Sequence, residues 1–183
     1  MDNTVSLNHL ITQYQTLCQY CDEFFTRTYE TFRSHMRCAK GCASCCMLET
    51  VAPLEAFMIS EYLKSLSDFT LPPPSVESGE IPCVFLHDDV CTIYPARPII
   101  CRTHGLPLIY PNQQEMEVCQ LNFAEVEITT IDPQYLLDAE SITENLMRFN
   151  LAFCMLTETP DRAEVRIPLY QIPKILKEDI TDG

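Results

Sequence analysis

Near the beginning of the chain, apolar residues recur at alternating steps of three and four positions. The series consists of Leu7, Leu10, Tyr14, Leu17, Cys21 and Phe24. This spacing places the side chains on one face of a helix and predicts a helix over residues 6–35 with a single buried seam. The seam is too short to indicate a coiled coil.

A second helical pattern begins at Pro53, a residue that suits the first turn of a helix. Its predicted buried stripe consists of Leu54, Phe57, Met58, Tyr62 and Leu66. The proline-rich segment 71–82 (LPPPSVESGEIP) that follows is expected to be a stiff surface loop.

The middle of the chain favours short strands. Residues 83–94 carry two apolar runs around His87-Asp88-Asp89, which predicts a hairpin. The runs at 106–110 and 115–119 predict a second hairpin that turns at Pro111-Asn112.

Helical patterns return after residue 131. Asp132-Pro133 predicts a helix start, and SITE (141–144) predicts a capping box at the start of another helix. The apolar face of that second helix consists of Ile142, Leu146, Phe149, Phe153 and Leu156. The region 133–178 should therefore be mostly helical and end in a short extended piece and a short helix.

These elements predict a mainly α fold with small β-hairpins. A chain of 183 residues is most simply a single domain, 1–183, and buries about 70% of its unfolded surface. We expect the N-terminal helix 6–35 and the C-terminal region 133–178 to surround a central cysteine-rich core, 38–119.

The composition excludes several classes of function. A net charge of −14 disfavours nucleic acid and anionic membrane surfaces as partners. No apolar run is long enough to span a bilayer, and the first residues do not resemble a secretory signal, so we expect a cytoplasmic protein. The four glycines are scattered, which disfavours a dinucleotide-binding or phosphate-binding loop. The oligomeric state is left open.

The cysteines carry the main chemical signal. There are eleven, an odd number, and the chain is longer than small disulfide-stabilised domains, so thiols available to metal are the favoured interpretation. Eight lie in the middle of the chain: Cys38, Cys42, Cys45, Cys46, Cys83, Cys91, Cys101 and Cys119. Thiolates select zinc, Cu(I) or iron–sulfur clusters.

The adjacent pair Cys45-Cys46 bears on the number of metal ions. Neighbouring side chains diverge in a strand and in a helix, so both sulfurs reach one tetrahedral ion only with difficulty. Eight thiolates suit two four-sulfur sites or one polynuclear centre with shared sulfurs. The alternative is that these cysteines are buried as small apolar side chains.

The remaining candidates are weighed differently. Cys18, Cys21 and Cys154 are predicted to be core residues, because they fall on or beside helical apolar faces. His104 is the best histidine candidate for a ligand. Arg97 and Arg102 flank Cys101 and either donate to its sulfur or form ordinary surface ion pairs.

The segments CAKGCASCC (38–46) and CVFLHDDVCTIYPARPIICR (83–102) together resemble the CxxCxxCC cysteine-cluster family, described as chelating zinc or iron. The resemblance implies ligand roles for Cys38, Cys42, Cys45, Cys46, Cys83, Cys91 and Cys101, with Cys119 as a further ligand. Two departures are three residues between Cys38 and Cys42, where the family name implies two, and Val84 in place of the usual proline. The family includes relatives of a flagellin lysine N-methylase.

Three functions follow from this reading. The first is a metal-binding protein whose cysteine cluster holds an iron–sulfur or zinc centre and serves redox chemistry, metal handling or protein interaction. The second is an iron–sulfur-dependent enzyme that transfers a methyl group to protein, because C-x3-C-x2-C also occurs in radical S-adenosylmethionine enzymes. Their large α/β barrel does not fit this length or element order. The third is a structural zinc module that docks another protein.

Overall fold

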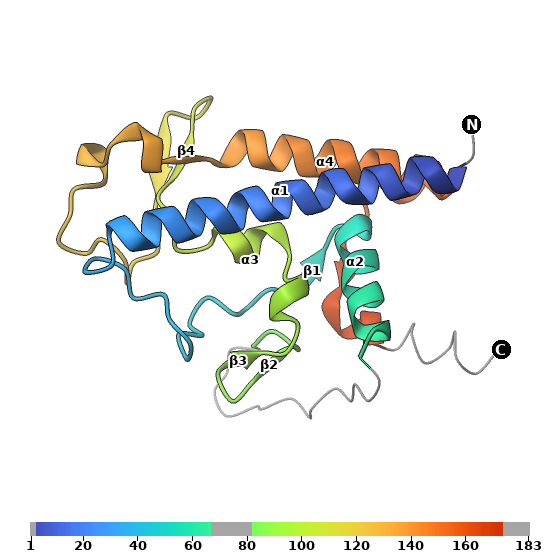
Figure 1. The fold of residues 1–183 in the computed structure, drawn as a ribbon, viewed down its shortest axis with the longest axis horizontal. Coiled ribbons are helices and arrows are strands. Elements are labelled where there is room, and N and C mark those ends of the chain that lie inside the picture. Colours follow the sequence, from blue (N-terminus) through green and yellow to red (C-terminus); the bar gives the residue numbers. More distant parts are fainter. Residues whose placement is uncertain (1–2, 67–81, 174–183) are drawn as a thin grey trace. The chain divides into compact units, whose positions relative to one another are not determined.

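The computed structural model describes residues 3–66 and 82–173. Its longest element is helix α1, Asn3–Thr31 (Figure 1). The predicted seam is buried at Leu10, Tyr14, Cys21 and Phe24, which confirms the helix and its buried face. The helix ends before residue 35, because residues 32–35 form a separate hydrogen-bonded turn.

Helix α2, Pro53–Lys64, begins at the predicted proline, but its buried face differs from the expectation. The buried residues are Leu54, Glu55, Ile59 and Leu63, whereas Phe57, Met58, Tyr62 and Leu66 are only partly buried. Apolar residues occur on more than one side of this helix, so their spacing did not identify the packed face. Glu55 can turn inward because its carboxylate accepts a hydrogen bond from the Ala52 N–H at the start of the helix.

The first predicted hairpin is present, with shorter strands than expected. Strands β2 (Leu86–His87) and β3 (Val90–Cys91) pair antiparallel. Asp88 and Asp89 connect them with φ angles of 47° and 58°. Two consecutive positive φ values are the mark of a type I′ turn, whose twist matches that of a hairpin. The chain then enters a single 3-10 turn, Tyr94–Ala96.

The second predicted hairpin is also present, and it gains a third strand. Strands β4 (Leu108–Tyr110) and β5 (Glu115–Glu117) pair antiparallel, and β6 (Leu137–Asp138) pairs with β4 in parallel. The prediction that a helix starts at Asp132-Pro133 was wrong. The Asp132 side chain accepts a hydrogen bond from the Gln134 N–H and supports only one 3-10 turn, Pro133–Tyr135, before the chain becomes extended.

Helix α4, Ala139–Leu156, corresponds to the predicted final long helix. Its start lies before the expected capping box, because the Asp138 carboxylate accepts hydrogen bonds from the N–H and the hydroxyl of Ser141. On the predicted apolar face, Ile142, Leu146 and Phe153 are buried, and Phe149 and Leu156 are partly buried.

The end of the described chain is extended, as expected. Strand β7 (Ile167–Pro168) pairs antiparallel with β1 (Thr50–Val51), and the 3-10 turn Leu169–Gln171 follows. Most of the predicted loop 71–82 and the final part of the region 133–178 lie outside the described residues.

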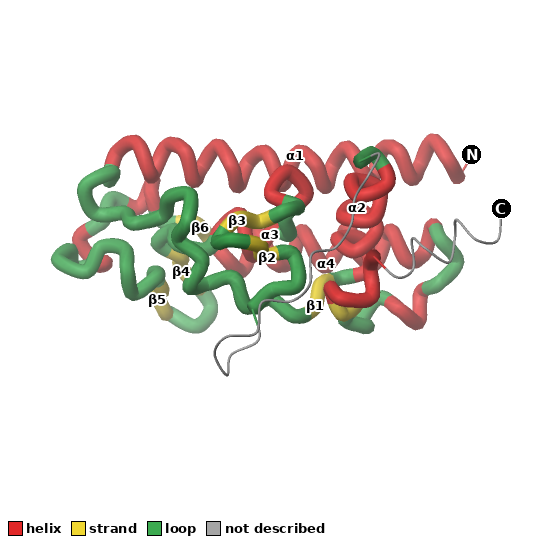
Figure 2. The backbone as a smooth tube through the Cα atoms, turned by 90° about the horizontal axis from the view of Figure 1, so that it is seen from below, coloured by secondary structure: helices red, strands yellow, loops and turns green. Residues whose placement is uncertain are grey.

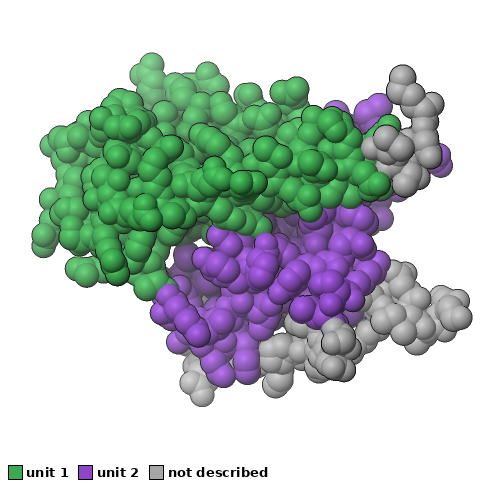
Figure 3. Space-filling view, in the orientation of Figure 1, with its two compact units in different colours: residues 1–39, 99–149 green, residues 40–98, 150–183 purple. Residues whose placement is uncertain are grey.

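The chain forms two compact units, each made of two separate segments (Figure 3). The first contains residues 1–39 and 99–149, and the second contains residues 40–98 and 150–183. The expectation of one domain remains a prediction. About 51% of the described residues are helical and 10% are in strands, which confirms a mainly α fold with small sheets (Figure 2).

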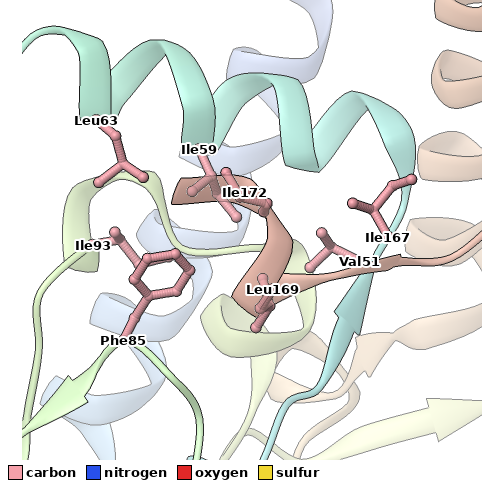
Figure 4. Close-up of a cluster of buried hydrophobic side chains, with 8 residues drawn as sticks. All are labelled: Val51, Ile59, Leu63, Phe85, Ile93, Ile167, Leu169 and Ile172. Atoms are coloured by element: carbon pink, nitrogen blue, oxygen red, sulfur yellow. The ribbon is translucent and has the colours of Figure 1, made fainter. Parts of the chain in front are cut away.

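The second unit contains a cluster of aliphatic and aromatic side chains (Figure 4). The cluster consists of Val51, Ile59, Leu63, Phe85, Ile93, Ile167, Leu169 and Ile172. It joins α2, the segment of the first hairpin and the β1–β7 pair, so these elements share one apolar core. Among the residues that the structure describes, no helix has both the length and the apolar composition needed to cross a bilayer.

Candidate metal centre

Solvent exposure separates the eleven cysteines into two groups. Cys18, Cys21 and Cys154 are buried, as predicted for core residues. Of the other eight, the predicted metal ligands, Cys45 and Cys101 are exposed and the remaining six are partly exposed. Cysteines that form no disulfide and serve only as small apolar side chains are usually among the most buried residues. The exposure of these eight therefore disfavours the alternative that they are only small core side chains.

The two cysteines of the first hairpin are held by the core of the second unit. Phe85 and Ile93 each follow a cysteine by two residues, and their side chains are 0% and 2% exposed. Cys83 and Cys91 lie beside the same apolar cluster and are partly buried. Each cysteine is thus placed by the buried residue that follows it.

Backbone hydrogen bonds reach both of these sulfurs. The backbone of Phe85 bonds to the Cys83 thiol, and the backbone of Ile93 bonds to the Cys91 thiol. A backbone N–H that donates to sulfur favours the thiolate, the form that binds metal. The arrangement occurs twice, so two similar thiolate positions belong to this hairpin, Cys83 just before β2 and Cys91 in β3.

The electrostatics of the pair oppose ionisation in the absence of metal. Burial raises the pKa of the Cys83 thiol, the backbone bond from Phe85 lowers it by less, and the neighbouring Cys91 raises it further. Burial also raises the pKa of Cys91, while the Ile93 backbone and the charge of Arg97 lower it. The two thiols are therefore close enough to repel each other as anions, and a cation between them would remove that repulsion.

The loop that carries Cys42, Cys45 and Cys46 is tied to this hairpin. The Cys83 N–H donates to the Cys46 carbonyl oxygen at 2.8 Å. Within the loop, the Cys46 N–H donates to the Ala43 carbonyl and the Met47 N–H donates to the Cys45 carbonyl, both at 2.9 Å. Gly41 has a φ of +93°, a value that side chains with a Cβ rarely adopt. Five of the eight predicted ligands thus belong to the second unit.

The other three predicted ligands, Cys38, Cys101 and Cys119, belong to the first unit. Cys38 follows the turn after α1, and its Sγ accepts a hydrogen bond from the Asn122 side-chain amide at 3.2 Å. Cys101 lies exposed on the short helix α3, Ile99–Thr103. Cys119 is partly buried, and its carbonyl oxygen accepts a hydrogen bond from the Asn122 N–H at 2.8 Å.

The two arginines have different surroundings. Arg102 is 7% exposed and pairs with Asp22 of α1, so it links α3 to α1 and is not the surface ion pair considered from sequence. Arg97 lies over the Tyr94 ring and donates to the Tyr94 carbonyl oxygen at 2.9 Å, and its charge acts on Cys91. His104 is exposed, and its role as a ligand remains a prediction.

Sequence reasoning missed Asn122 as a residue of this region. It is 2% exposed, and nothing in the segment around it marks it from sequence, apart from its position three residues after Cys119. It also missed that Arg97 acts on Cys91, which the hairpin and the following 3-10 turn bring close.

The donor set fits zinc or iron in its chemistry, since both metals accept thiolate ligands. Within residues 3–66 and 82–173, however, no group of three or more Cys, His, Asp or Glu side chains is already assembled around one point. Metal sites commonly form together with the binding event, and the ordering of ligands is then part of the binding free energy. Which of the eight thiols bind metal remains a prediction.

A comparison with known proteins identifies one family. No curated protein and no solved structure matches the chain. The model of one family, described as "Putative zinc- or iron-chelating domain", matches residues 37–129, which are 93 of the 183 residues. The match includes all eight predicted ligand cysteines. The chain therefore belongs to the CxxCxxCC family of zinc- or iron-chelating domains.

Proposed function

We propose that the protein binds a polynuclear iron–sulfur or zinc centre through the eight cysteines of residues 38–119. The observation that carries the proposal is the Cys83–Cys91 hairpin. Its two thiols repel each other as anions, each has a backbone hydrogen bond, and the N–H of Cys83 is bonded to the carbonyl of Cys46. Two neighbouring thiolates are unfavourable without a cation, and a metal ion bound by both would remove their repulsion.

The number of thiols supports more than one metal ion. Five predicted ligands lie in the second unit and three in the first, and a single tetrahedral ion takes four. Adjacent Cys45 and Cys46 also suit two neighbouring metals better than one. When bound, the centre supplies either one-electron chemistry, if it is iron–sulfur, or a structural link between loops, if it is zinc. We favour roles in redox chemistry, metal handling or protein interaction.

A structural zinc module is a second candidate, and the shortness of the hairpin favours it. Strands β2 and β3 contain two residues each, and two-stranded hairpins are marginal on their own. Zinc contributes on the order of 10 kcal/mol in small domains, which is ample to order such a hairpin. Methyl transfer to protein remains a prediction that rests on the C-x3-C-x2-C spacing and on the resemblance to relatives of flagellin lysine N-methylase.

The test is the metal content and visible spectrum of protein purified without oxygen. We expect at least two metal ions per chain, and brown protein with iron and labile sulfide distinguishes the cluster from colourless zinc protein. Replacing Cys83 and Cys91 by Ser should remove metal, whereas Cys154→Ala is the matched control and should not. Wild-type protein with one metal ion or none would contradict the polynuclear centre.

Amide exchange tests where the metal acts. Removing metal under reducing conditions should speed exchange across 38–48 and 83–119, because the strands there contain only two or three residues each and two-stranded hairpins are marginal on their own. Protection in α1 should persist, because its buried face does not depend on the thiolates. Equal protection of the loops before and after metal removal would show that the cysteines sit on a preformed scaffold and that the metal does not order it.

A further inference from the structure

The side chain of Asn122 is buried and uses all of its polar atoms in the first unit. Its Oδ1 accepts a hydrogen bond from the Arg37 N–H at 2.7 Å, and its Nδ2 donates to the Gly105 carbonyl oxygen at 2.7 Å. The same Nδ2 donates to Cys38 Sγ at 3.2 Å. A carboxamide nitrogen carries two hydrogens, so both of these bonds can form at once.

The two backbone partners fix which way the amide points. The Arg37 N–H can only donate and therefore needs Oδ1, and the Gly105 carbonyl can only accept and therefore needs Nδ2. The NH₂ group must then face the sulfur of Cys38. Because an amide NH₂ group cannot accept a hydrogen bond, sulfur is the acceptor in this contact.

Gly105 lies against the same sulfur. A Cβ built on Gly105 would stand 2.5 Å from Cys38 Sγ and 3.1 Å from Asn122 Nδ2. Glycine therefore leaves just enough room for the thiol beside the amide. The sulfur therefore lies between the Asn122 amide and the Gly105 backbone, and these neighbours limit the rotamers of Cys38.

Asn122 also brings together three segments that carry predicted ligands. Its backbone N–H bonds to the Cys119 carbonyl, and the next residue, Phe123, donates to the His35 carbonyl at 2.7 Å. Gly105 follows α3, which carries Cys101. One buried residue thus links the segments of Cys38, Cys101 and Cys119, the first two through its side chain and the third through its backbone N–H.

We propose that Asn122 is a positioning residue that holds Cys38 as a metal ligand by donating an N–H···S hydrogen bond to its sulfur. This inference rests on the proposed function. A donor of this kind is stronger toward a metal-bound thiolate than toward a thiol, because the acceptor then carries charge. Outer-sphere partners of this type change metal affinity by about 10–100-fold when they are removed.

Asn150 provides a matched control. It is 1% exposed, its Oδ1 accepts from the Leu54 N–H at 3.0 Å, and its Nδ2 donates to the Ala163 carbonyl oxygen at 2.7 Å. Its bonds to backbone groups are therefore equivalent to those of Asn122, but neither of these partners is a cysteine. The comparison of Asn122→Asp with Asn150→Asp separates the effect on sulfur from the general cost of altering a buried amide.

The experiment measures binding of Co²⁺ and Zn²⁺ to the full chain under reducing conditions. We expect Asn122→Asp to weaken binding by about 10–100-fold and to change the sulfur-to-cobalt charge-transfer absorption. Asn150→Asp should change neither. In a Cys38→Ser background, Asn122→Asp should have no further effect on affinity, because the sulfur through which it acts is absent.

Three results would overturn the inference: unchanged affinity and spectrum in Asn122→Asp, the same change in Asn150→Asp, or a full effect of Asn122→Asp in the Cys38→Ser background. Wild-type protein that binds neither ion and is also purified without iron would overturn the proposed function itself. Nuclear magnetic resonance of the wild-type chain keeps the test open if Asn122→Asp does not fold. The side-chain amide signals of Asn122 should shift on zinc loading and those of Asn150 should not, and unshifted Asn122 signals would refute the contact.

Discussion

Replacing Gly105 by Ala tests how closely Cys38 is held in the first unit. Gly105 has a φ of +96°, and an added Cβ would lie 2.5 Å from Cys38 Sγ. Gly41 offers the matched control, because its φ is +93° and an added Cβ would meet nothing within 4 Å. Both alanine variants carry the same backbone strain, and only Gly105→Ala adds a contact with the thiol.

The expected magnitudes follow from these two terms. A residue with a Cβ at positive φ costs about 1–2 kcal/mol, partly offset by about 0.4–1 kcal/mol from a less flexible unfolded chain. Gly41→Ala should therefore lower the free energy of unfolding by about 1 kcal/mol. In Gly105→Ala the sulfur must also shift from its place beside Asn122, and disturbing a buried donor adds about 1–3 kcal/mol. The total for Gly105→Ala is then about 2–4 kcal/mol.

Urea unfolding of the metal-free, reduced protein measures both variants, and Zn²⁺ titration measures their affinity. We expect Gly105→Ala to be the less stable variant and to bind zinc more weakly than Gly41→Ala. In a Cys38→Ala background, the two glycine substitutions should differ less, because the sulfur that meets the new Cβ is gone. Equal loss of stability in the two single variants, or an unchanged difference in that background, would refute the reasoning.

Three further outcomes are expected. The pKa values of Cys83 and Cys91 are both raised above the ordinary 9.0 in the folded, metal-free chain. The protonated thiols therefore stabilise the fold below about pH 9. This contribution is lost as pH rises through the folded pKa. Urea midpoints measured from neutral to alkaline pH should therefore fall more steeply for the metal-free wild type than for the variant with both residues replaced by Ala, and parallel curves would contradict this. Replacing Asp88 by Asn together with Asp89 by Gly should raise the free energy of unfolding by up to about 1 kcal/mol, because both positions have positive φ in a type I′ turn; a lower urea midpoint would argue against that turn. The buried cysteines are Cys18, Cys21 and Cys154. An Ala variant of each should keep the wild-type metal content in elemental analysis, and loss of metal in any one variant would place that cysteine among the ligands.

Local patterns in the sequence were sufficient for several elements. The alternation of three and four between Leu10 and Phe24 identifies α1 and its buried face, because helix geometry repeats over the same short interval. Asp88-Asp89 between two apolar runs identifies the first hairpin, because few residues tolerate positive φ. The split between core cysteines and exposed cysteines also followed from their place on, or away from, helical faces.

The tertiary structure decided features that depend on distant partners. Ile59 and Leu63, and not Met58 and Tyr62, form the buried face of α2, because the other residues of the apolar cluster lie elsewhere in the chain. Leu137 lies in a strand because it pairs with β4, although the preceding Asp132-Pro133 predicted a helix.

The same reason applies to the candidate site. The spacing of the cysteines within residues 38–46 indicates thiolate chemistry, and that spacing is visible in nine residues of sequence. The assignment of five thiols to one unit and three to the other depends on which segments fold together. The role of Asn122 requires Arg37, Cys38 and Gly105 to meet it from segments far apart in the sequence. A local sequence pattern indicates which secondary structure or site one segment can form. Hydrogen bonds between distant segments exist only once the chain has folded.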